Sequence, residues 1–348
     1  MATMVQAVRM ALNFAEENYD LKDVFGQDVG APLGGVFTAT QGLKTSWNTP
    51  LDERGIVSAA IGLGLAGEKC VAEIQFCDYI FNTIDLLKYA GNLNWSSNGN
   101  YNLPITLMTP VGAGIRGSVY HSHSFDAWAT RLPGWKIVMP STPLDAYGLM
   151  LSAIEDPNPV MFLMPKALTR AKGEELIPGE PGEKELKDAI DAPIGDRSKW
   201  KPKWPAVKEH KIPLGEAKVV TEGTDLTIVS YGRTLPLCKK IAENHEASIE
   251  VIDLRCLYPY DWNTIYNSIK KTKRVLFVNE DTEVTNFAEH LSYRVCTSDL
   301  FYRIYAPPKV LAGKNVPGIG LHPNLEEATV PYEKEIEKEI NEVLKVVP

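Results

Sequence analysis

The hydrophobic positions of this 348-residue chain fall into short apolar runs separated by helix-like stretches. In the first half these runs are bounded by turn residues, which is typical of strands buried on both faces of a parallel sheet. Helical periodicity fills the intervals and also predicts a helix start within residues 1–12. The predicted strands are 70–76, 104–110, 136–140 and 159–164, and the predicted helices are 56–65, 81–93 and 144–155.

The second half repeats this alternation and predicts a small doubly wound domain. Asp261 stands where it can cap the start of a helix. The predicted strands are 226–231, 248–254, 274–279 and 303–306, and the predicted helices are 235–246, 261–271, 286–300 and 326–346.

Residues 171–211 interrupt the alternation with a composition rich in Pro, Gly, Glu and Lys. A stretch of this length is unusual as a connection inside one compact domain, so it predicts an interdomain linker. Trp200 and Trp204 are apolar anchors that favour a linker lying on a protein surface. The predicted organisation is therefore a domain at 1–170, a linker at 171–211 and a second domain at 212–348.

Composition narrows the classes of partner. The net charge is −8 and the basic residues form no cluster, so nucleic acid and anionic membranes have no electrostatic support as partners. The apolar runs are too short for a membrane helix, and mean hydropathy is −0.15, as in soluble globular proteins. The five cysteines are scattered without a C-x-x-C pair, which argues against disulfides and structural zinc.

Three segments carry candidate chemistry, and each follows a predicted strand or enters a predicted helix. Glu53 lies where a loop enters an apolar helix, although an acidic helix start favoured by the helix dipole would look the same. Gln75 and Tyr79 follow a strand end, where open α/β sheets bind their ligands, although a helix capped by Asp78 is the simpler alternative.

The third segment is the glycine-rich stretch at residues 112–117, followed by His121 and His123. It has the G-x-G-x-x-G spacing, but no helix begins inside it, so a dinucleotide site is not favoured. The two histidines lack further ligands at metal-binding spacing, so a histidine acting on substrate is the better hypothesis. All three segments could meet at one edge of a sheet.

Together these segments resemble the beta subunits of the thiamine-dependent decarboxylating component of 2-oxo acid dehydrogenase complexes. The resemblance runs in order through nearly the whole chain. The matching stretches are 25–30, 34–37, 42–43, 49–56, 73–79, 120–122, 138–143, 154–159 and 252–255 with Pro259. It implies an α/β fold in which a thiamine-binding, pyrimidine-type parallel-sheet domain precedes a doubly wound domain like the C-terminal domain of transketolase.

The resemblance also implies roles for individual residues. Glu53 would hydrogen-bond N1′ of the aminopyrimidine of thiamine diphosphate, a task that suits a carboxylate shielded from bulk water. Leu51, Gln75 and Tyr79 would line the pyrimidine pocket, with Tyr79 stacking on the ring. His121 would lie near the substrate and assist acyl transfer to the lipoyl group.

The same resemblance implies two metal ions, potassium and magnesium. A potassium ion would be held through backbone carbonyls of Leu103, Ile105, Thr106, Ala153, Asp156 and Asn158. The chain lacks a G-D-G motif followed by Asn, so magnesium and the diphosphate half of the cofactor would come from an alpha subunit. The family assembles as an α2β2 heterotetramer whose beta subunit contacts the lipoyl-bearing acyltransferase.

The motifs at 75–79 and 120–122 resemble the branched-chain enzymes most, which predicts decarboxylation of a branched-chain 2-oxo acid and acyl transfer to the lipoyl group. The alternatives are a pyruvate or acetoin dehydrogenase beta subunit, a non-catalytic scaffold subunit, or a self-sufficient transketolase-like enzyme. The expected location is the prokaryotic cytoplasm or the mitochondrial matrix. The chain departs from the family pattern at His123, often Gln, and at residues 280–286, where paired glycines are usual.

Overall fold

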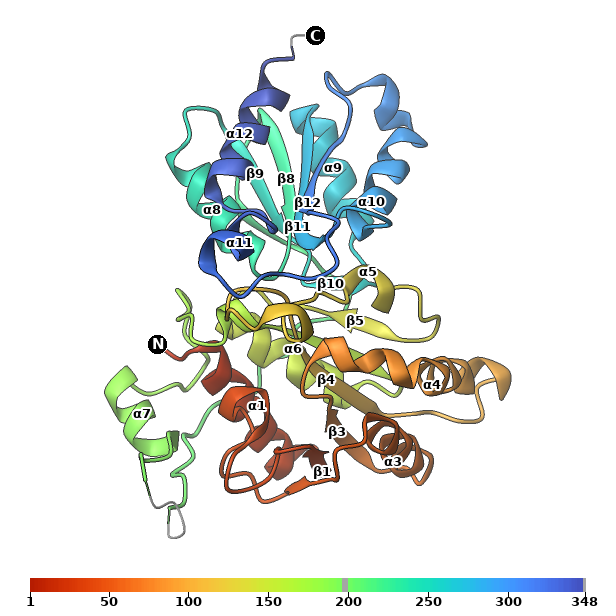
Figure 1. The fold of residues 1–348 in the computed structure, drawn as a ribbon, viewed down its shortest axis with the longest axis vertical. Helices are drawn as coiled ribbons and strands as arrows, with labels where there is room; N and C mark the ends of the chain where they lie inside the picture. Colours follow the sequence, from red (N-terminus) through yellow and green to blue (C-terminus); the bar gives the residue numbers. More distant parts are fainter. Residues whose placement is uncertain (196–199, 347–348) are drawn as a thin grey trace. The chain divides into compact units, whose positions relative to one another are not determined.

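The computed structural model describes residues 1–195 and 200–346, which form two compact units (Figure 1). The first unit comprises residues 1–110, 131–164 and 168–214. The second comprises residues 111–130, 165–167 and the described chain from Gly215 onward. The glycine-rich and histidine-bearing segment therefore belongs to the second unit, although it lies within the first 170 residues of the chain.

The first unit is built on parallel strands in the order β5-β6-β4-β3-β1-β2. Strand β1 pairs with β3 and β2, so the segments that follow these three strands leave from the same edge of the sheet. The strands are β1 (Leu21–Gly26), β2 (Ser46–Asn48), β3 (Lys69–Glu73), β4 (Ile105–Val111), β5 (Lys136–Val138) and β6 (Val160–Pro165).

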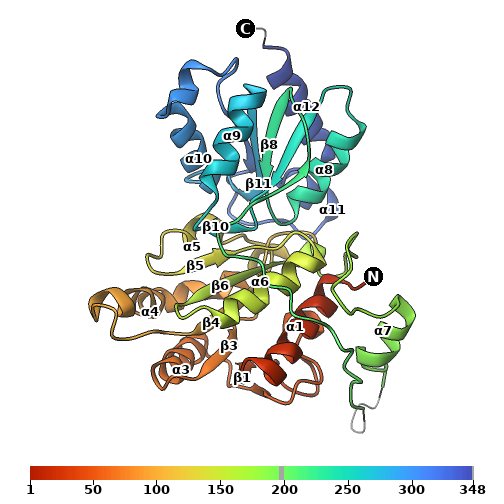
Figure 2. The same ribbon diagram turned by 180° about the vertical axis from the view of Figure 1, so that it is seen from behind.

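Helices cover both faces of this sheet (Figures 1 and 2). Helices α3 (Glu53–Leu65) and α4 (Ile84–Ser96) lie together on one face, and α1 (Met4–Asn18) packs along α6 (Pro143–Glu155) on the other. The remaining short elements are α2 (Gly35–Thr38), η1 (Cys77–Thr83) and α7 (Glu183–Ile190). Among the described helices of the whole chain, none is long and apolar enough to cross a membrane.

The second unit has a sheet in the order β12-β11-β8-β9-β7, parallel except for the β7–β9 pair. Helices α8 and α12 cover one face, and α9 and α10 cover the other (Figure 2). The strands are β7 (Lys218–Thr221), β8 (Leu226–Ser230), β9 (Ile249–Asp253), β10 (Cys256–Tyr258), β11 (Val275–Thr282) and β12 (Lys309–Gly313). The helices are η2 (Ser118–Tyr120), α5 (Asp126–Ala129), η3 (Lys166–Leu168), α8 (Thr234–Asn244), α9 (Trp262–Thr272), α10 (Phe287–Cys296), η4 (Asp299–Tyr302), α11 (Pro323–Glu327) and α12 (Glu333–Leu344).

Most predicted elements are confirmed within a few residues, and three are corrected. The strand predicted at 303–306 is irregular, and the strand that completes the sheet is β12, after Pro307 and Pro308. The helix predicted at 326–346 is two helices, because Pro331 stands between α11 and α12 and cannot continue a helix. The helix predicted at 286–300 ends at Cys296 and is followed by η4.

The predicted linker lies on the first unit and contains helix α7, which was not predicted. Its backbone is held by hydrogen bonds such as Lys208 N to Pro178 O at 2.7 Å and Tyr147 Oη to Lys208 O at 3.0 Å. Trp200 lies against Gly42, as expected for an apolar anchor on a surface. Residues 196–199 of this segment lie outside the described chain.

Candidate functional site at the edge of the first sheet

Glu53 is the first residue of α3, where the positive end of the helix dipole favours a carboxylate. Its Oε2 accepts a hydrogen bond from Asn82 Nδ2 at 3.2 Å. In the same turn, Arg54 donates two hydrogen bonds, at 2.7 and 2.9 Å, to the carboxylate of Asp85 in α4. Bonding to Arg54 lowers the pKa of Asp85 to about 2. Glu53 is only half-buried and its neighbour Leu51 is 71% exposed, so this chain alone leaves the carboxylate in contact with water.

Gln75 and Tyr79 follow the end of β3 and are half-buried. The pKa of Tyr79 is raised, first by burial and then by the nearby carboxylates of Asp78 and Glu53. Glu53 and Tyr79 therefore lie near each other. Gln75 Nε2 lies 3.4 Å from Asp28 Oδ2, in the segment that follows β1. The pairing of β1 with β2 and β3 brings the segments that carry Glu53 and Gln75 to one edge of the sheet, whereas the third predicted segment, with His121, belongs to the second compact unit.

Glu73, the last residue of β3, is a further candidate that local sequence reasoning did not single out. Its side chain is 1% exposed, and Oε1 accepts the Val36 N–H at 2.8 Å. Among the described residues, Oε2 has no hydrogen-bond partner. Burial raises the pKa of Glu73 to about 8. The signal available in the sequence was a charged residue closing an otherwise apolar strand, which is rare without a purpose.

The Val36 N–H belongs to a strained turn. Val36, Phe37 and Thr38 have φ values of 30°, 52° and 95°, a region that residues with a Cβ rarely adopt. A Cβ on Gly35 would lie 2.0 Å from Glu73 Oε2, so the turn can approach the carboxyl only with glycine there. Strain of this kind persists where surrounding contacts enforce it, and it concentrates at ligand-binding sites.

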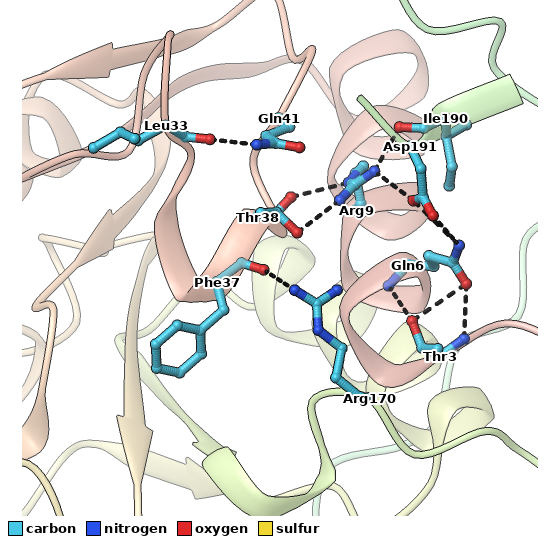
Figure 3. Close-up of polar contacts among 10 residues, drawn as sticks. All are labelled: Thr3, Gln6, Arg9, Leu33, Phe37, Thr38, Gln41, Arg170, Ile190 and Asp191. Atoms are coloured by element: carbon cyan, nitrogen blue, oxygen red, sulfur yellow. Dashed lines mark hydrogen bonds and ion pairs between the residues drawn. The ribbon is translucent and has the colours of Figure 1, made fainter. Parts of the chain in front are cut away.

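Arg9 supplies the main enforcing contacts (Figure 3). This α1 side chain is 1% exposed, and it donates to Thr38 O and Thr38 Oγ1, both at 3.0 Å. Its Nη1 donates to Ile190 O at 2.5 Å and to Asp191 Oδ1 at 3.2 Å, at the end of α7. Arg9 therefore joins the strained turn, helix α1 and the predicted linker.

The strained turn connects to Tyr79 through aromatic contacts. The Phe37 and Phe76 rings meet edge to face with centroids 6.1 Å apart, and Phe76 meets Tyr79 in the same way at 5.9 Å. A shift of the turn would therefore be passed to Tyr79 through two ring contacts.

Replacing Glu73 with Gln is expected to change the pH dependence of stability. A carboxyl whose pKa is about 8 in the folded chain and about 4.5 when unfolded stabilises the fold most when it is protonated. That contribution is complete below about pH 4.5 and is lost as pH rises to about 8. The Gln variant should gain stability relative to the parent chain between pH 5 and pH 8.5, by on the order of a few kcal/mol.

Urea unfolding at several pH values measures this difference. Glu174→Gln, at an exposed position of the same unit, is the matched control and should show no such trend. A constant difference between Glu73→Gln and the parent from pH 5 to 8.5 would contradict a neutral Glu73 at neutral pH.

His121 lies in the second unit, in the loop that carries η2. Its Nδ1 is 3.1 Å from Gly117 O, and because a carbonyl can only accept, Nδ1 is the protonated nitrogen. In the neutral ring Nε2 is then the basic atom. The ring is half-buried.

The six residues expected around potassium lie on two adjoining segments of the first unit. Leu103 N donates to Pro157 O at 2.9 Å, which places the start of β4 beside the turn after α6. Ala153 lies in the last turn of α6, and its carbonyl accepts the Asp156 N–H at 3.3 Å. Lys136 already pairs with the Asp156 carboxylate. Across the described residues, no group of three or more His, Cys, Asp or Glu side chains could hold a metal ion.

Models of two protein domains match this chain. The pyrimidine-binding domain of transketolase matches residues 1–172, and the C-terminal domain of transketolase matches residues 215–336. Among solved structures, this chain is similar to a split-gene transketolase described as an inactive beta4 tetramer. The TM-score is 0.68 over 99% of each chain. The sequence identity is 16%, so the similarity is one of fold. The fold and the matched domains thus define a two-domain protein of the transketolase class, which confirms the predicted fold class.

Relatives with higher identity narrow the class. The 2-oxoisovalerate dehydrogenase subunit beta of Pseudomonas aeruginosa is 37% identical over 90% of this chain and 88% of its own length. The pyruvate dehydrogenase E1 component subunit beta of Acholeplasma laidlawii is 36% identical over 90% of each chain. The chain belongs to the family of 2-oxo acid dehydrogenase beta subunits, and the resemblance seen in its sequence is confirmed.

Proposed function

We propose that this chain is the beta subunit of a branched-chain 2-oxo acid dehydrogenase, in which Glu53 activates thiamine diphosphate. The observation that carries the proposal is the Glu53 carboxylate at the start of α3, near Tyr79 at the carboxyl edge of the parallel sheet. When bound, the cofactor supplies a carbon nucleophile that adds to the 2-oxo group and stabilises the charge left when CO2 departs.

The residues at this edge fit an aminopyrimidine ring. Glu53 offers a hydrogen-bond acceptor for a ring nitrogen, Gln75 offers an amide, and Tyr79 offers an aromatic face. Leu51 adds apolar surface that is exposed in the single chain. Because Glu53 remains half-exposed, a second polypeptide must cover it before it can act in a water-excluded site.

That second polypeptide is the alpha subunit, which would hold magnesium and the diphosphate. The family supports a pairing of this kind, and we infer an α2β2 assembly that passes its acyl group to a lipoyl acyltransferase. His121 would assist this transfer. Its Nδ1–H is held by Gly117 O, so Nε2 is the ring nitrogen that would accept or return a proton at the acyl-transfer step.

The substrate is inferred from motifs, since relatives named for 2-oxoisovalerate and for pyruvate have nearly equal identity to this chain. The test is to co-purify the chain with its alpha subunit and compare kcat/KM for 2-oxoisovalerate and pyruvate, with a lipoyl domain as acceptor. We expect 2-oxoisovalerate to be preferred. A preference for pyruvate would contradict the proposed branched-chain substrate. If the complex turned over no 2-oxo acid, the result would favour a non-catalytic scaffold subunit. Tight binding of thiamine diphosphate and magnesium by this chain alone would overturn the shared site.

We also propose that the chain divides into domains 1–170 and 212–348, joined by a linker at 171–211.

We further propose a potassium site. Backbone carbonyls of the two adjoining segments, 103–106 and 153–158, suit a hard cation. The thermal midpoint should rise in potassium chloride relative to sodium chloride of equal ionic strength. Equal midpoints in the two salts would argue against the site.

A further inference from the structure

The loop that carries His121 is held by three carboxylates from the far end of the chain. Glu326 in α11 is 4% exposed, and its Oε2 accepts the backbone N–H groups of Gly114 at 3.1 Å and Arg116 at 3.2 Å. These partners are separated by 212 and 210 residues in sequence. A buried carboxylate that accepts two backbone N–H groups fixes the path of the backbone between them.

Glu280, near the end of β11, provides a second anchor. Its side chain is 8% exposed, and Oε2 accepts the Ala113 N–H at 3.0 Å. A Cβ on Gly112 would lie 2.0 Å from Glu280 Oε1, so the loop meets this carboxyl at a position where φ is +84° and glycine is needed. The guanidinium of Arg233 lies 3.9 Å from the same carboxyl and helps to hold it in place.

Asp281 provides the third anchor, at the other end of the loop. Its Oδ2 accepts the Ala127 N–H at 3.1 Å, in the first turn of α5.

Asp126 lies inside this acidic group and is fully buried. Burial, and then the carboxylates of Asp281 and Glu280, raise the pKa of Asp126 well above its usual value. The raised pKa favours the neutral form of Asp126, which limits repulsion between it and the two anchors.

The loop between the anchors is strained and needs external support. Arg116 and Ser118 have φ values of 57° and 63°, in the left-handed region that residues with a Cβ avoid. Ala113 packs in a small apolar cluster with Ile319 and Val330 from the same C-terminal region that carries Glu326. The turn that ends in Gly117 O, the acceptor for His121 Nδ1, begins at these anchored amides.

We propose that Glu280, Asp281 and Glu326 are positioning residues for His121, and that they hold its loop for acyl transfer to the lipoyl group. The proposal rests on the proposed function for the role of His121. Because the anchors act through the backbone amides, they shape the loop without touching substrate. The chemistry before acyl transfer depends on Glu53 and should proceed without them.

The test compares Glu326→Gln with Glu327→Gln in the complex with the alpha subunit. The two positions are adjacent in α11, but Glu327 is exposed, so the control removes the same charge without touching the loop. The rate of hydrogen exchange at the backbone amides of residues 112–120 measures how firmly the loop is held. Decarboxylation with an artificial electron acceptor and acylation of a lipoyl domain are measured separately.

We expect Glu326→Gln to speed exchange at the Gly114 and Arg116 amides and to lower kcat for lipoyl acylation, each by about tenfold, because a neutral amide is a weaker acceptor for the two N–H groups than a carboxylate. Decarboxylation with the artificial acceptor and KM for the lipoyl domain should stay within about twofold of the parent. Glu327→Gln should change none of these quantities.

An unchanged rate of hydrogen exchange in Glu326→Gln would contradict the claim that Glu326 holds the loop. Faster exchange with unchanged acylation would overturn the positioning role. If the parent complex decarboxylates no 2-oxo acid, the proposed function fails, while the exchange measurement still decides whether Glu326 holds the loop. Glu280→Gln, measured in the same way, keeps the test decisive if Glu326→Gln does not fold.

Discussion

Glu53→Gln in the complex with the alpha subunit is expected to lower kcat for 2-oxo acid decarboxylation by about 10²–10⁴-fold, the usual contribution of a positioned acid–base group. Gln keeps the size of the side chain and can still hydrogen-bond, but it cannot hold a negative charge against a ring nitrogen. The Asn82 bond to Glu53 is exposed, so folding should change by less than about 1 kcal/mol. The loss should therefore appear in turnover and leave the thermal midpoint unchanged.

The matched control is Asp52→Asn, which removes a carboxylate one residue earlier. Asp52 is exposed at the N-cap of α3, and its loss should leave decarboxylation within about twofold. Steady-state decarboxylation with an artificial electron acceptor separates this step from acyl transfer, and calorimetry of cofactor binding separates activation from affinity. Equal turnover of Glu53→Gln and the parent would refute the activating role.

The site at the edge of the first sheet could be predicted because it is local in the chain. Glu53, Gln75 and Tyr79 each follow a short strand or open a helix, and adjacent parallel strands carry such segments to one edge. The half-exposure of Glu53 in the single chain could not be predicted, because a local pattern places a residue at a helix start without fixing which side chains pack over it.

The long-range contacts that hold this edge and the His121 loop in place could not be predicted in the same way. Arg9 sits in an amphipathic helix where any long polar residue fits the pattern, and its partners are 29 and 181 residues away. The anchors of the His121 loop are more than 150 residues from the amides they bind. Periodicity reports which face of an element is buried, but not which distant backbone group a buried charge will meet.

The same limit applies to the His121 segment. It follows β4 directly and lies within residues 1–172, which match the pyrimidine-binding domain. Its hydrogen bonds to Glu280, Asp281 and Glu326 nevertheless group it with the second compact unit. Short-range sequence patterns carry no information about such contacts.

Arg9→Met is expected to destabilise the chain by about 3–5 kcal/mol, the summed cost of leaving several buried or half-buried acceptors without their donor. Met replaces the aliphatic stem, so packing within α1 is largely kept. The carbonyls of Thr38 and Ile190 and the Asp191 carboxylate would lose their donor. Burial lowers the pKa of Arg9 to about 10, so the guanidinium is charged at neutral pH and its full set of bonds is present there.

The control for Arg9→Met is Arg170→Met, because Arg170 contacts the same strained turn from the surface. Arg170 is exposed and donates to Phe37 O at 3.3 Å, so its loss should cost less than about 1 kcal/mol. Urea unfolding followed by tryptophan fluorescence measures both variants. Since Arg9 also holds the turn that reaches Tyr79 through Phe37 and Phe76, Arg9→Met should weaken cofactor binding in the complex as well as stability. If Arg9→Met proved as stable as Arg170→Met, the strained turn would have to be enforced by Glu73 and its own glycines, and Arg9 would serve only to fasten the linker to α1.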